Sequence, residues 1–415
     1  MAKKTINKEL TGAQDLYNFL FEACNIIRGP VSQDNFKDYI TPLLYYKRIS
    51  DVYDEETEEA LISSGGDKEY ASLPEQHRFV IPDGCHWQEV RERTENLGAA
   101  IVGAMRQIEI ANPDTLYGVL SMFSSQKWTN KAILNDSKIR DLIEHLSKRK
   151  LGNKDYPADL MGDAYEILLK KFADDSKAQA GEFYTPRSVV RLLVHILDPQ
   201  PGETVYDPAC GSGGMLIEAI RYMHDDSLCC GSIFGQEKNV VNAAIAKMNL
   251  FLHGASDFNV MQGDTLRDPK ILQGGNIAKF DCVIANPPFS LENWGATEWS
   301  SDKYKRNIYG TPSDSCGDYA WIQHMICSMS SGKGRMAVVM PQGILFRGNQ
   351  EAEIRKQLVE SDLIEAVVTL GDKLFYGTGL SPCFLIIRRM KQAHHSGRIL
   401  MIDGSKILTQ KRAQN

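Results

Sequence analysis

Long apolar runs are missing from this sequence, and no window approaches the ~18 uncharged apolar residues that a membrane-spanning helix needs. The N-terminus, MAKKTINKEL, has no apolar run after its lysines, so a secretory signal is not expected. The nine cysteines are odd in number and include no C-x-x-C pair, which fits neither a disulfide framework nor a zinc site. The nine histidines show no ligand spacing. These absences predict a cytoplasmic protein with no membrane partner and no bound metal.

Positive charge is also in short supply. The chain has 47 Lys and Arg against 53 Asp and Glu, for a net charge of −6. Domains that bind nucleic acid are commonly basic. Any affinity for DNA must therefore come from a local basic face or from a partner subunit.

The length of 415 residues favours two domains, each with its own core. The first part of the chain shows helical spacing of apolar residues, as in the segment that starts at Phe36, where Pro42 is expected to kink a helix or start a new one. Further helices are expected around Trp87–Ile110 and Lys138–Lys148. A polar connector with the sequence KRKLGNKDYP follows. We therefore predict an all-α N-terminal domain of residues 1–152 and a second domain of residues 153–415.

The second domain opens with a helix at Leu160–Phe172, after which short runs rich in Val and Ile alternate with helical stretches. Strands are expected at Thr204–Tyr206, Ser232–Gly235, Asn259–Met261, Asp281–Ala285, Arg335–Met340, Ile364–Thr369 and Cys383–Arg388. Helices are expected at Gly214–His224, Val240–His253, Tyr319–Ser328 and Glu351–Ser361. This alternation predicts an α/β fold with a mostly parallel sheet covered on both faces. Ligands of such sheets bind outside the carboxyl ends of the strands.

The first strand leads into Asp207-Pro-Ala-Cys-Gly-Ser-Gly-Gly. Glycines at 211, 213 and 214 allow a sharp turn and a close approach of backbone to ligand. The carboxylate of Asp207 suits a cationic group better than a phosphate, which argues against a dinucleotide loop. A tight strand-to-helix turn without a ligand would also explain the glycines.

Two further acids follow the next two strands. Glu237 lies in Phe-Gly-Gln-Glu-Lys-Asn and can accept hydrogen bonds from a ribose diol. Asp264 lies in Gln-Gly-Asp-Thr-Leu and can accept from an adenine amino group. Either acid alone fits a solvated loop. Their shared position after successive strands favours a common ligand.

The string Asn286-Pro-Pro-Phe follows directly after the strand Phe-Asp-Cys-Val-Ile-Ala. Pro287 and Pro288 make a rigid, extended arm and remove two donors. The Asn286 side-chain oxygen and the Pro287 carbonyl can then both accept from one NH₂ group, which makes its nitrogen a better nucleophile. Phe289 offers a stacking face to a flipped base, a contact worth about 1–3 kcal/mol. A structural Pro-Pro turn is the alternative, but the glycine loop upstream favours catalysis.

These strings, preceded by Gly181-Glu-Phe-Tyr-Thr-Pro, resemble the amino-methyltransferases of DNA and, more closely, the modification (M) subunit of type I restriction-modification systems. The resemblance covers nearly the whole chain. It includes Tyr39-Ile-Thr-Pro-Leu-Leu, Asp159-Leu-Met-Gly-Asp-Ala-Tyr-Glu, Asp318-Tyr-Ala-Trp, Met340-Pro-Gln-Gly-Ile-Leu-Phe-Arg-Gly and Gly371-Asp-Lys-Leu-Phe-Tyr-Gly-Thr-Gly. It implies a Rossmann-like S-adenosylmethionine-dependent methyltransferase domain that methylates the N6 amino group of adenine in double-stranded DNA.

The resemblance also assigns roles to residues and implies partners. The target adenine would be held by Asn286, Pro287, Pro288 and Phe289. The cofactor S-adenosyl-L-methionine would be bound by Phe183, Tyr184, Thr185 and Pro186 at its methionine end, Asp207, Gly211, Ser212 and Gly213 in the loop, Glu237 at the ribose and Asp264 at the adenine. A separate specificity (S) subunit would read the DNA, with two M subunits per S, and a restriction (R) subunit would cleave it.

Two features depart from the family pattern. Family members usually continue into a C-terminal helical tail that helps engage the S subunit, and this sequence shows no such tail after Lys411-Arg-Ala-Gln-Asn. Thr378-Gly-Leu-Ser-Pro-Cys replaces more usual polar residues. Enzymes that methylate guanine amino groups of ribosomal RNA or glutamine side chains of proteins share the Asn-Pro-Pro-aromatic arm and are one alternative. A non-catalytic assembly subunit is another.

Overall fold

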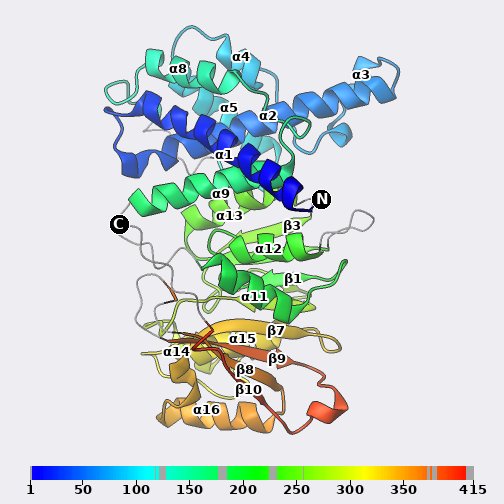
Figure 1. Ribbon diagram of the computed structural model, residues 1–415, viewed down its shortest axis with the longest axis vertical. Coiled ribbons are helices and arrows are strands. Elements are labelled where there is room, and N and C mark those ends of the chain that lie inside the picture. Colours follow the sequence, from blue (N-terminus) through cyan, green and yellow to red (C-terminus); the bar gives the residue numbers. More distant parts are fainter. Residues whose placement is uncertain are drawn as a thin grey trace. The chain divides into compact units, whose positions relative to one another are not determined.

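The computed structural model describes residues 2–116, 118–120, 128–175, 185–223, 231–255, 257–371, 374–375 and 381–407. The chain divides into two compact units, Met1–Ala178 with Lys247–Gly254, and Gln179–Ala246 with Ala255–Asn415. Figure 1 shows that the first unit is built from helices and that the second is built around a sheet. This confirms the predicted α/β fold with a helical region before it.

The helices of the first unit pack through their apolar faces. They are α1 (Ala2–Ile27), α2 (Lys37–Ser63), α3 (Lys68–Ala71), α4 (Trp87–Arg91), α5 (Leu97–Ala111), α6 (Pro113–Leu116), α8 (Asp136–Ser147) and α9 (Ala158–Asp175), with 3-10 turns η1 (Gln33–Asn35) and η2 (Pro74–Gln76). Pro42 lies inside α2 and does not begin a new helix. The stretch predicted around Trp87–Ile110 is divided into α4 and α5, since Asn96 between them adopts a left-handed φ of 52°.

A buried arginine forms hydrogen bonds to the polar connector that was predicted at the end of the helical region. Arg48 of α2 is 2% exposed, and its guanidinium donates to the carbonyls of Leu151 and Tyr156, the latter at 2.9 Å. By packing, α9 groups with this unit because it lies along α1. The end of α13 groups with it too, where Phe251 packs edge-on to Tyr45 at 5.2 Å. The domain boundary between residues 152 and 153 stays a prediction.

The second unit contains an eight-stranded sheet in the order β10-β8-β9-β7-β6-β1-β2-β3. Its strands are β1 (Val205–Asp207), β2 (Ile233–Glu237), β3 (Phe258–Gln262), β6 (Cys282–Ala285), β7 (Arg335–Pro341), β8 (Ile364–Thr369), β9 (Pro382–Arg388) and β10 (Leu400–Asp403). β9 runs antiparallel to both its neighbours, and the other pairs are parallel. All seven predicted strands are confirmed. β10 and the small hairpin of β4 (Leu272–Gln273) and β5 (Asn276–Ile277) were not predicted.

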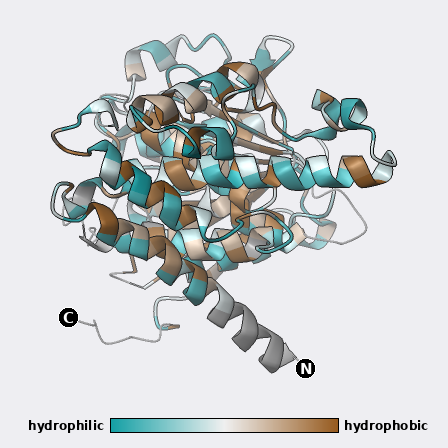
Figure 2. Cartoon of the chain, turned by 90° about the horizontal axis from the view of Figure 1, so that it is seen from above, coloured by the Kyte–Doolittle hydropathy of each residue, from teal (hydrophilic) through white to brown (hydrophobic). Residues whose placement is uncertain are grey.

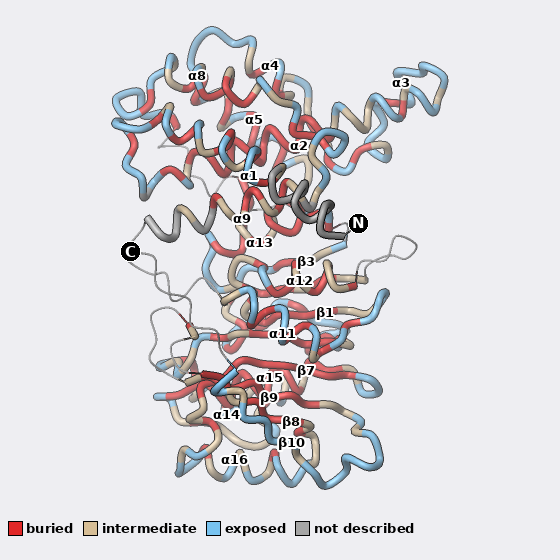
Figure 3. Tube along the Cα trace, viewed as in Figure 1, coloured by how far each residue is buried: buried red, intermediate tan, exposed pale blue. Residues whose placement is uncertain are grey.

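Helices cover both faces of this sheet. They are α11 (Arg187–Leu197), α12 (Gly214–Met223), α13 (Val240–Leu252), α14 (Ala296–Ser300), α15 (Asp318–Ser328) and α16 (Asn349–Glu360), with 3-10 turns η3 (Gln342–Leu345) and η4 (Ala393–His395). Alternate residues of β6 and β7, such as Val283 and Val338, pack in one apolar cluster with α15 and α16. α11 also contacts β6 and β7 but contributes nothing to that cluster in the described residues, so it covers the opposite face. Figure 3 shows β7 and β9 mostly in red, as buried residues.

The helices mix apolar and polar residues along their length, as the alternating brown and teal of Figure 2 shows. Among the helices that the structure describes, none is long and apolar enough to span a membrane.

Candidate active site

The predicted site residues of the second unit lie at the point where the order of the strands in the sheet reverses. β1 lies between β2 and β6 and is parallel to both, with Tyr206 opposite Phe234 on one side and Val283 on the other. The chain proceeds from β1 to β2 and β3 on one side, and then crosses to β6 on the other. This is a topological switch point, where open α/β sheets bind ligands. Asp207 ends β1, and Asn286 follows the end of β6.

The loop between β1 and α12 requires glycine at two positions. Gly211 has a φ of +54° and Gly213 a φ of +84°, in the left-handed region that residues with a Cβ rarely adopt. The Gly213 N–H donates to the carbonyl of Cys210 at 2.8 Å, which closes the turn just before α12 begins. In the part of the chain that the structure describes, no atom beyond Gly211 and its two chain neighbours lies within 4 Å of where a Cβ on Gly211 would stand. A ligand can therefore approach the backbone closely at this residue.

Asp207 places a buried carboxyl group beneath this loop. Asp207 is 2% exposed, and its Oδ1 accepts a hydrogen bond from the Ala209 N–H at 2.9 Å. Burial, together with a smaller contribution from the nearby carboxylate of Glu237, raises the pKa of Asp207 to about 8. A cationic ligand group beside Asp207 would favour its ionised form.

Glu237 lies at the end of β2 and is hydrogen-bonded to the same loop. Its carboxylate accepts from the Gly211 N–H at 3.0 Å and from the Asn239 N–H at 2.7 Å. Burial raises the pKa of Glu237 too. Glu237, the acid predicted to bind a ribose diol, thus lies beside the glycine loop and already accepts hydrogen bonds from two backbone N–H groups.

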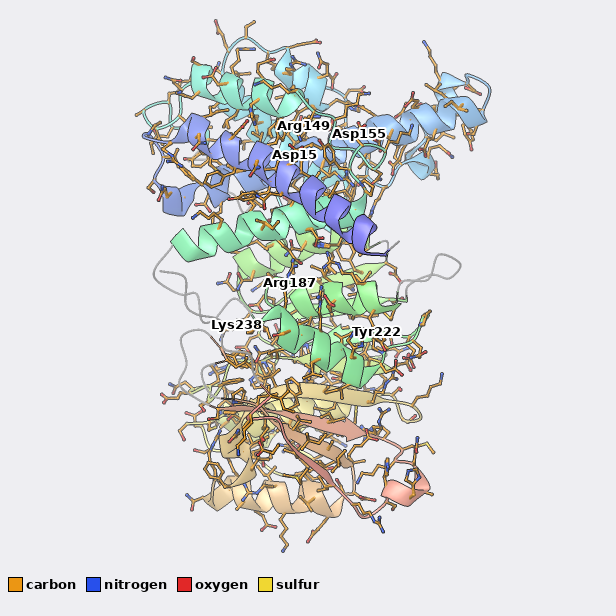
Figure 4. The ribbon with its side chains drawn as sticks, viewed as in Figure 1. Asp15, Arg149, Asp155, Arg187, Tyr222 and Lys238 are labelled. Carbon is orange, nitrogen blue, oxygen red and sulfur yellow. The ribbon has the colours of Figure 1, made fainter. Side chains whose placement is uncertain are left out.

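Asp264 follows β3 and uses its two oxygens differently. Oδ1 accepts from the N–H groups of Leu266 and Arg267, both at 3.2 Å, which shapes the loop after the strand. Oδ2 forms an ion pair with Nζ of Lys238 at 2.8 Å. The Lys238 side chain, labelled in Figure 4, is 72% exposed and can leave at small cost. A contact between Asp264 Oδ2 and an adenine amino group would compete with that ion pair.

Asn286 has one half of its amide engaged and the other half unused. Nδ2 donates to Oγ1 of Thr185 at 2.8 Å. Oδ1 is buried and has no hydrogen-bond partner among the residues that the structure describes. An unsatisfied buried acceptor costs about 1–3 kcal/mol, so its presence needs an explanation. Sequence reasoning assigned Thr185 to the cofactor and did not foresee its bond to Asn286.

The rest of the arm and its surroundings are aromatic. Pro287 is buried, Pro288 is exposed and Phe289 is half-buried. The Phe289 ring lies 6.1 Å from that of Phe375, at an interplanar angle of 64°. Phe375 was missed as a candidate, although it belongs to the quoted string that begins at Gly371.

The remaining predicted residues are less informative. Pro186 precedes α11, and Ser212 lies half-buried in the glycine loop. Phe183 and Tyr184, predicted at the methionine end of the cofactor, lie outside the described residues. Within the described ranges no three His, Cys, Asp or Glu side chains are arranged to hold a metal ion.

Comparison with known proteins gives two family matches. The N-6 DNA methylase family model matches residues 156–415, and the HsdM N-terminal domain model matches residues 16–146. These two ranges together cover most of the chain.

Individual relatives agree with those matches. The MjaVII methylase subunit of a type I restriction enzyme from Methanocaldococcus jannaschii is 34% identical over 381 residues, which is 87% of this chain and 63% of that protein. The MjaVIII methylase subunit from the same organism is 33% identical over 424 residues, 96% of this chain and 69% of that protein. The chain therefore spans about two thirds of the length of these relatives, 63% and 69%.

A solved structure is similar over almost its whole length. The crystal structure of a type I restriction-modification system methyltransferase subunit from Streptococcus thermophilus superposes with a TM-score of 0.80 at 26% identity, covering 97% of this chain and 90% of that one. The helical unit, the switch-point site and the match over residues 156–415 together show that this chain belongs to the N-6 DNA methylase family.

Proposed function

We propose that this chain transfers a methyl group from S-adenosyl-L-methionine to the N6 amino group of adenine in double-stranded DNA, as the modification subunit of a type I restriction-modification complex. One observation carries the proposal. The buried Oδ1 of Asn286 has no hydrogen-bond partner among the described residues, while Nδ2 of the same amide donates to Thr185 at 2.8 Å. This arrangement turns the amide oxygen toward an incoming donor.

The chemistry follows from two acceptors on one rigid arm. An exocyclic amine that donates its hydrogens to Oδ1 of Asn286 and to the carbonyl of Pro287 has its lone pair drawn away from the ring. Bound S-adenosyl-L-methionine supplies an electrophilic sulfonium methyl group. Asn286 and Pro287 would hold the amine nitrogen toward that methyl group, and solvent would take the proton that the nitrogen loses on methylation. An amine is already a nucleophile, so this chain's contribution is positioning, which can lower a barrier greatly.

The residues at the switch point fit the proposed cofactor. Gly211 leaves open space beside the backbone, and the buried carboxyl of Asp207 offers charge to a cationic ligand. Glu237 and Asp264 would accept from the ribose diol and the adenine amino group. Thr185 and Pro186, with Phe183 and Tyr184, would line the methionine end. Family membership supports the use of this cofactor.

Two aromatic rings support capture of an adenine outside the helix. Phe289 is half-buried at the end of the arm, and Phe375 lies edge-on to it at 6.1 Å. A base that enters beside Asn286 would stack on Phe289, with the Phe375 ring closing the pocket behind it. Enzymes that act on a base in a duplex take it out of the stack in this way.

The proposed partners are a specificity subunit, a restriction subunit and DNA, with two copies of this chain per specificity subunit. Support comes from the relatives, which are methylase subunits of type I restriction enzymes. The net charge of −6 also favours a division in which another chain reads the DNA sequence.

The proposal is tested by nucleoside mass spectrometry on host DNA after expression with a candidate specificity subunit. N6-methyladenine is expected with the unmutated chain and with Asn276→Ala, a matched control in the exposed β5 hairpin. Asn286→Ala should abolish it while calorimetry still detects S-adenosyl-L-methionine binding. New methylation of ribosomal RNA or of protein glutamine, with none in DNA, would replace DNA as the acceptor. Full activity of Asn286→Ala would refute the role of the arm.

A further inference from the structure

The catalytic arm is followed by a residue in an unfavourable backbone conformation. Ser290 comes directly after Phe289 and has a φ of +51°, in the left-handed region that residues other than glycine seldom adopt. Such a conformation persists where the surroundings hold it. The Ser290 N–H donates to Oδ1 of Asp318 at 2.8 Å. The arm is therefore held at its downstream end by a carboxylate from another element.

Asp318 is the first residue of α15 and is 0% exposed. A carboxylate this deeply buried needs compensating charge and hydrogen bonds. Its Oδ2 forms an ion pair with Nη2 of Arg347 and accepts a weak hydrogen bond from Cys316 Sγ at 3.4 Å. Arg347 in turn pairs with Glu351 at 3.0 Å. Arg347 therefore provides the positive charge that allows Asp318 to stay buried beneath the arm.

Backbone hydrogen bonds extend this attachment along the chain. The Gly317 N–H donates to the Leu291 carbonyl, and the Asn293 N–H donates to the Asp314 carbonyl, both at 2.9 Å. A Cβ on Gly317 would stand 3.0 Å from the ring of Trp294, so the two segments touch closely there. Residues 290–294 are thus clamped to residues 313–318.

Arg347 contacts this clamp from the segment that follows the neighbouring strand. It follows β7 and η3, and β7 is the parallel neighbour of β6, whose end carries the arm. The strings Asp318-Tyr-Ala-Trp and Met340-Pro-Gln-Gly-Ile-Leu-Phe-Arg-Gly therefore meet at one ion pair. Neither string has a role in the function proposed above.

We propose that Arg347 and Asp318 are positioning residues for methyl transfer. They hold the Asn-Pro-Pro-Phe arm in the position and orientation that the target amine requires. The inference rests on the proposed function, because it concerns the same arm. Release of Asp318 from Arg347 would leave a buried unpaired carboxylate, and relaxation of that carboxylate would let Ser290 leave its left-handed conformation. Asn286 and Phe289 would then shift together. A displacement of about 1 Å at reacting groups can reduce a rate by roughly 100-fold.

The test compares two arginines that form ion pairs with carboxylates, Arg347 after β7 and η3 and Arg335 at the start of β7. Arg347→Met breaks the pair with Asp318, whereas Arg335→Met breaks the pair with Glu203, whose closest atoms are 2.7 Å apart, at the start of the strand and away from the arm. Both variants, Arg347→Lys and the wild type are purified with the specificity subunit that supports methylation of host DNA. Steady-state kinetics give kcat and KM for duplex DNA per folded molecule, calorimetry gives the affinity for S-adenosyl-L-methionine, and thermal unfolding gives stability.

Arg347→Met should lower kcat by about tenfold or more, with a smaller change in KM and a cofactor affinity within about twofold of wild type. Arg347→Lys keeps the charge without the guanidinium fork and should recover part of kcat. Arg335→Met should lose stability while keeping kcat. Equal kcat losses in Arg347→Met and Arg335→Met, or no loss in either, would overturn the positioning role while the proposed function stands. A wild-type complex that methylates no adenine would overturn the proposed function and this inference with it.

Discussion

The buried carboxyl group of Asp207 adds a pH-dependent contribution to the stability of this chain, and Asp207→Asn should remove that contribution. Asp207 is 2% exposed, and burial, together with a smaller contribution from the nearby Glu237 carboxylate, raises its pKa to about 8. In the unfolded chain the same group should titrate near ~3.9. Between these values the folded chain keeps a proton that the unfolded chain has released. The stability that this proton confers is complete at acidic pH and is lost as the pH rises through about 8.

The size of the effect follows from the same linkage. Each pH unit in this window changes the free energy of unfolding by about 1.4 kcal/mol per proton. Between pH 5 and pH 8 the wild type should lose roughly 4 kcal/mol through this group. Asn retains an oxygen that can accept from the Ala209 N–H, and it cannot ionise. Glu237 titrates in both proteins, so its contribution largely cancels in the difference.

Urea unfolding at pH 5, 6, 7 and 8 measures this directly. The unfolding free energy of Asp207→Asn minus that of wild type should grow by about 1.4 kcal/mol per pH unit. Asp314→Asn is the control, because it removes an exposed carboxyl instead of a buried one. A difference between Asp207→Asn and wild type that stays constant from pH 5 to pH 8 would refute the reasoning.

Three further predictions concern ligand binding and transfer. Lys238→Ala frees Asp264 and should strengthen S-adenosyl-L-methionine binding by up to about fivefold, because an exposed ion pair is worth about 0–1 kcal/mol; weaker binding in calorimetry would mean that Lys238 contacts the cofactor. Phe375→Ala should raise KM for duplex DNA by roughly fivefold or more with little change in cofactor affinity, since base–aromatic contacts are worth about 1–3 kcal/mol; an unchanged KM would exclude Phe375 from the base pocket. Thr185→Val removes the acceptor that orients the Asn286 amide and should lower kcat by about three- to tenfold, the worth of one net hydrogen bond. Thr185→Ser should retain kcat in steady-state kinetics, and an equal loss of kcat in Thr185→Val and Thr185→Ser would contradict the orienting role.

The sheet was predictable from sequence because its central strands are buried on both faces. Such strands are short runs rich in Val and Ile, and the run at Ile364–Thr369 coincides with β8. β10 (Leu400–Asp403) carries no comparable signal, since all four of its residues are exposed at the edge of the sheet. The β4–β5 hairpin was missed for a different reason, because each strand has two residues around Gly274 and Gly275. Neither element is long enough to show a period.

One rule about parallel sheets was enough to predict which residues of the site lie together. Residues at the carboxyl ends of adjacent parallel strands share an edge, which placed Asp207, Glu237, Asp264 and Asn286 together. The rule does not say which atoms are already bonded. The bond between Thr185 and Asn286 joins residues 101 positions apart and depends on how α11 packs on the sheet. Contacts of that kind follow from tertiary packing and leave no local pattern in the sequence.

The residues proposed for the cofactor include acidic ones, whereas those proposed for the adenine are uncharged. The two ligands differ in the same way, because the cofactor carries a positive sulfonium and the adenine is neutral. The residues proposed for the cofactor include the acids Asp207, Glu237 and Asp264, each of which accepts backbone N–H groups from the loops around the site. Acids gathered in this way favour a ligand that carries positive charge, as a sulfonium does. The residues proposed for adenine, Asn286 and Phe289 among them, are uncharged. A neutral base can then be desolvated between neutral groups, and its amine meets an acceptor that needs no counter-ion.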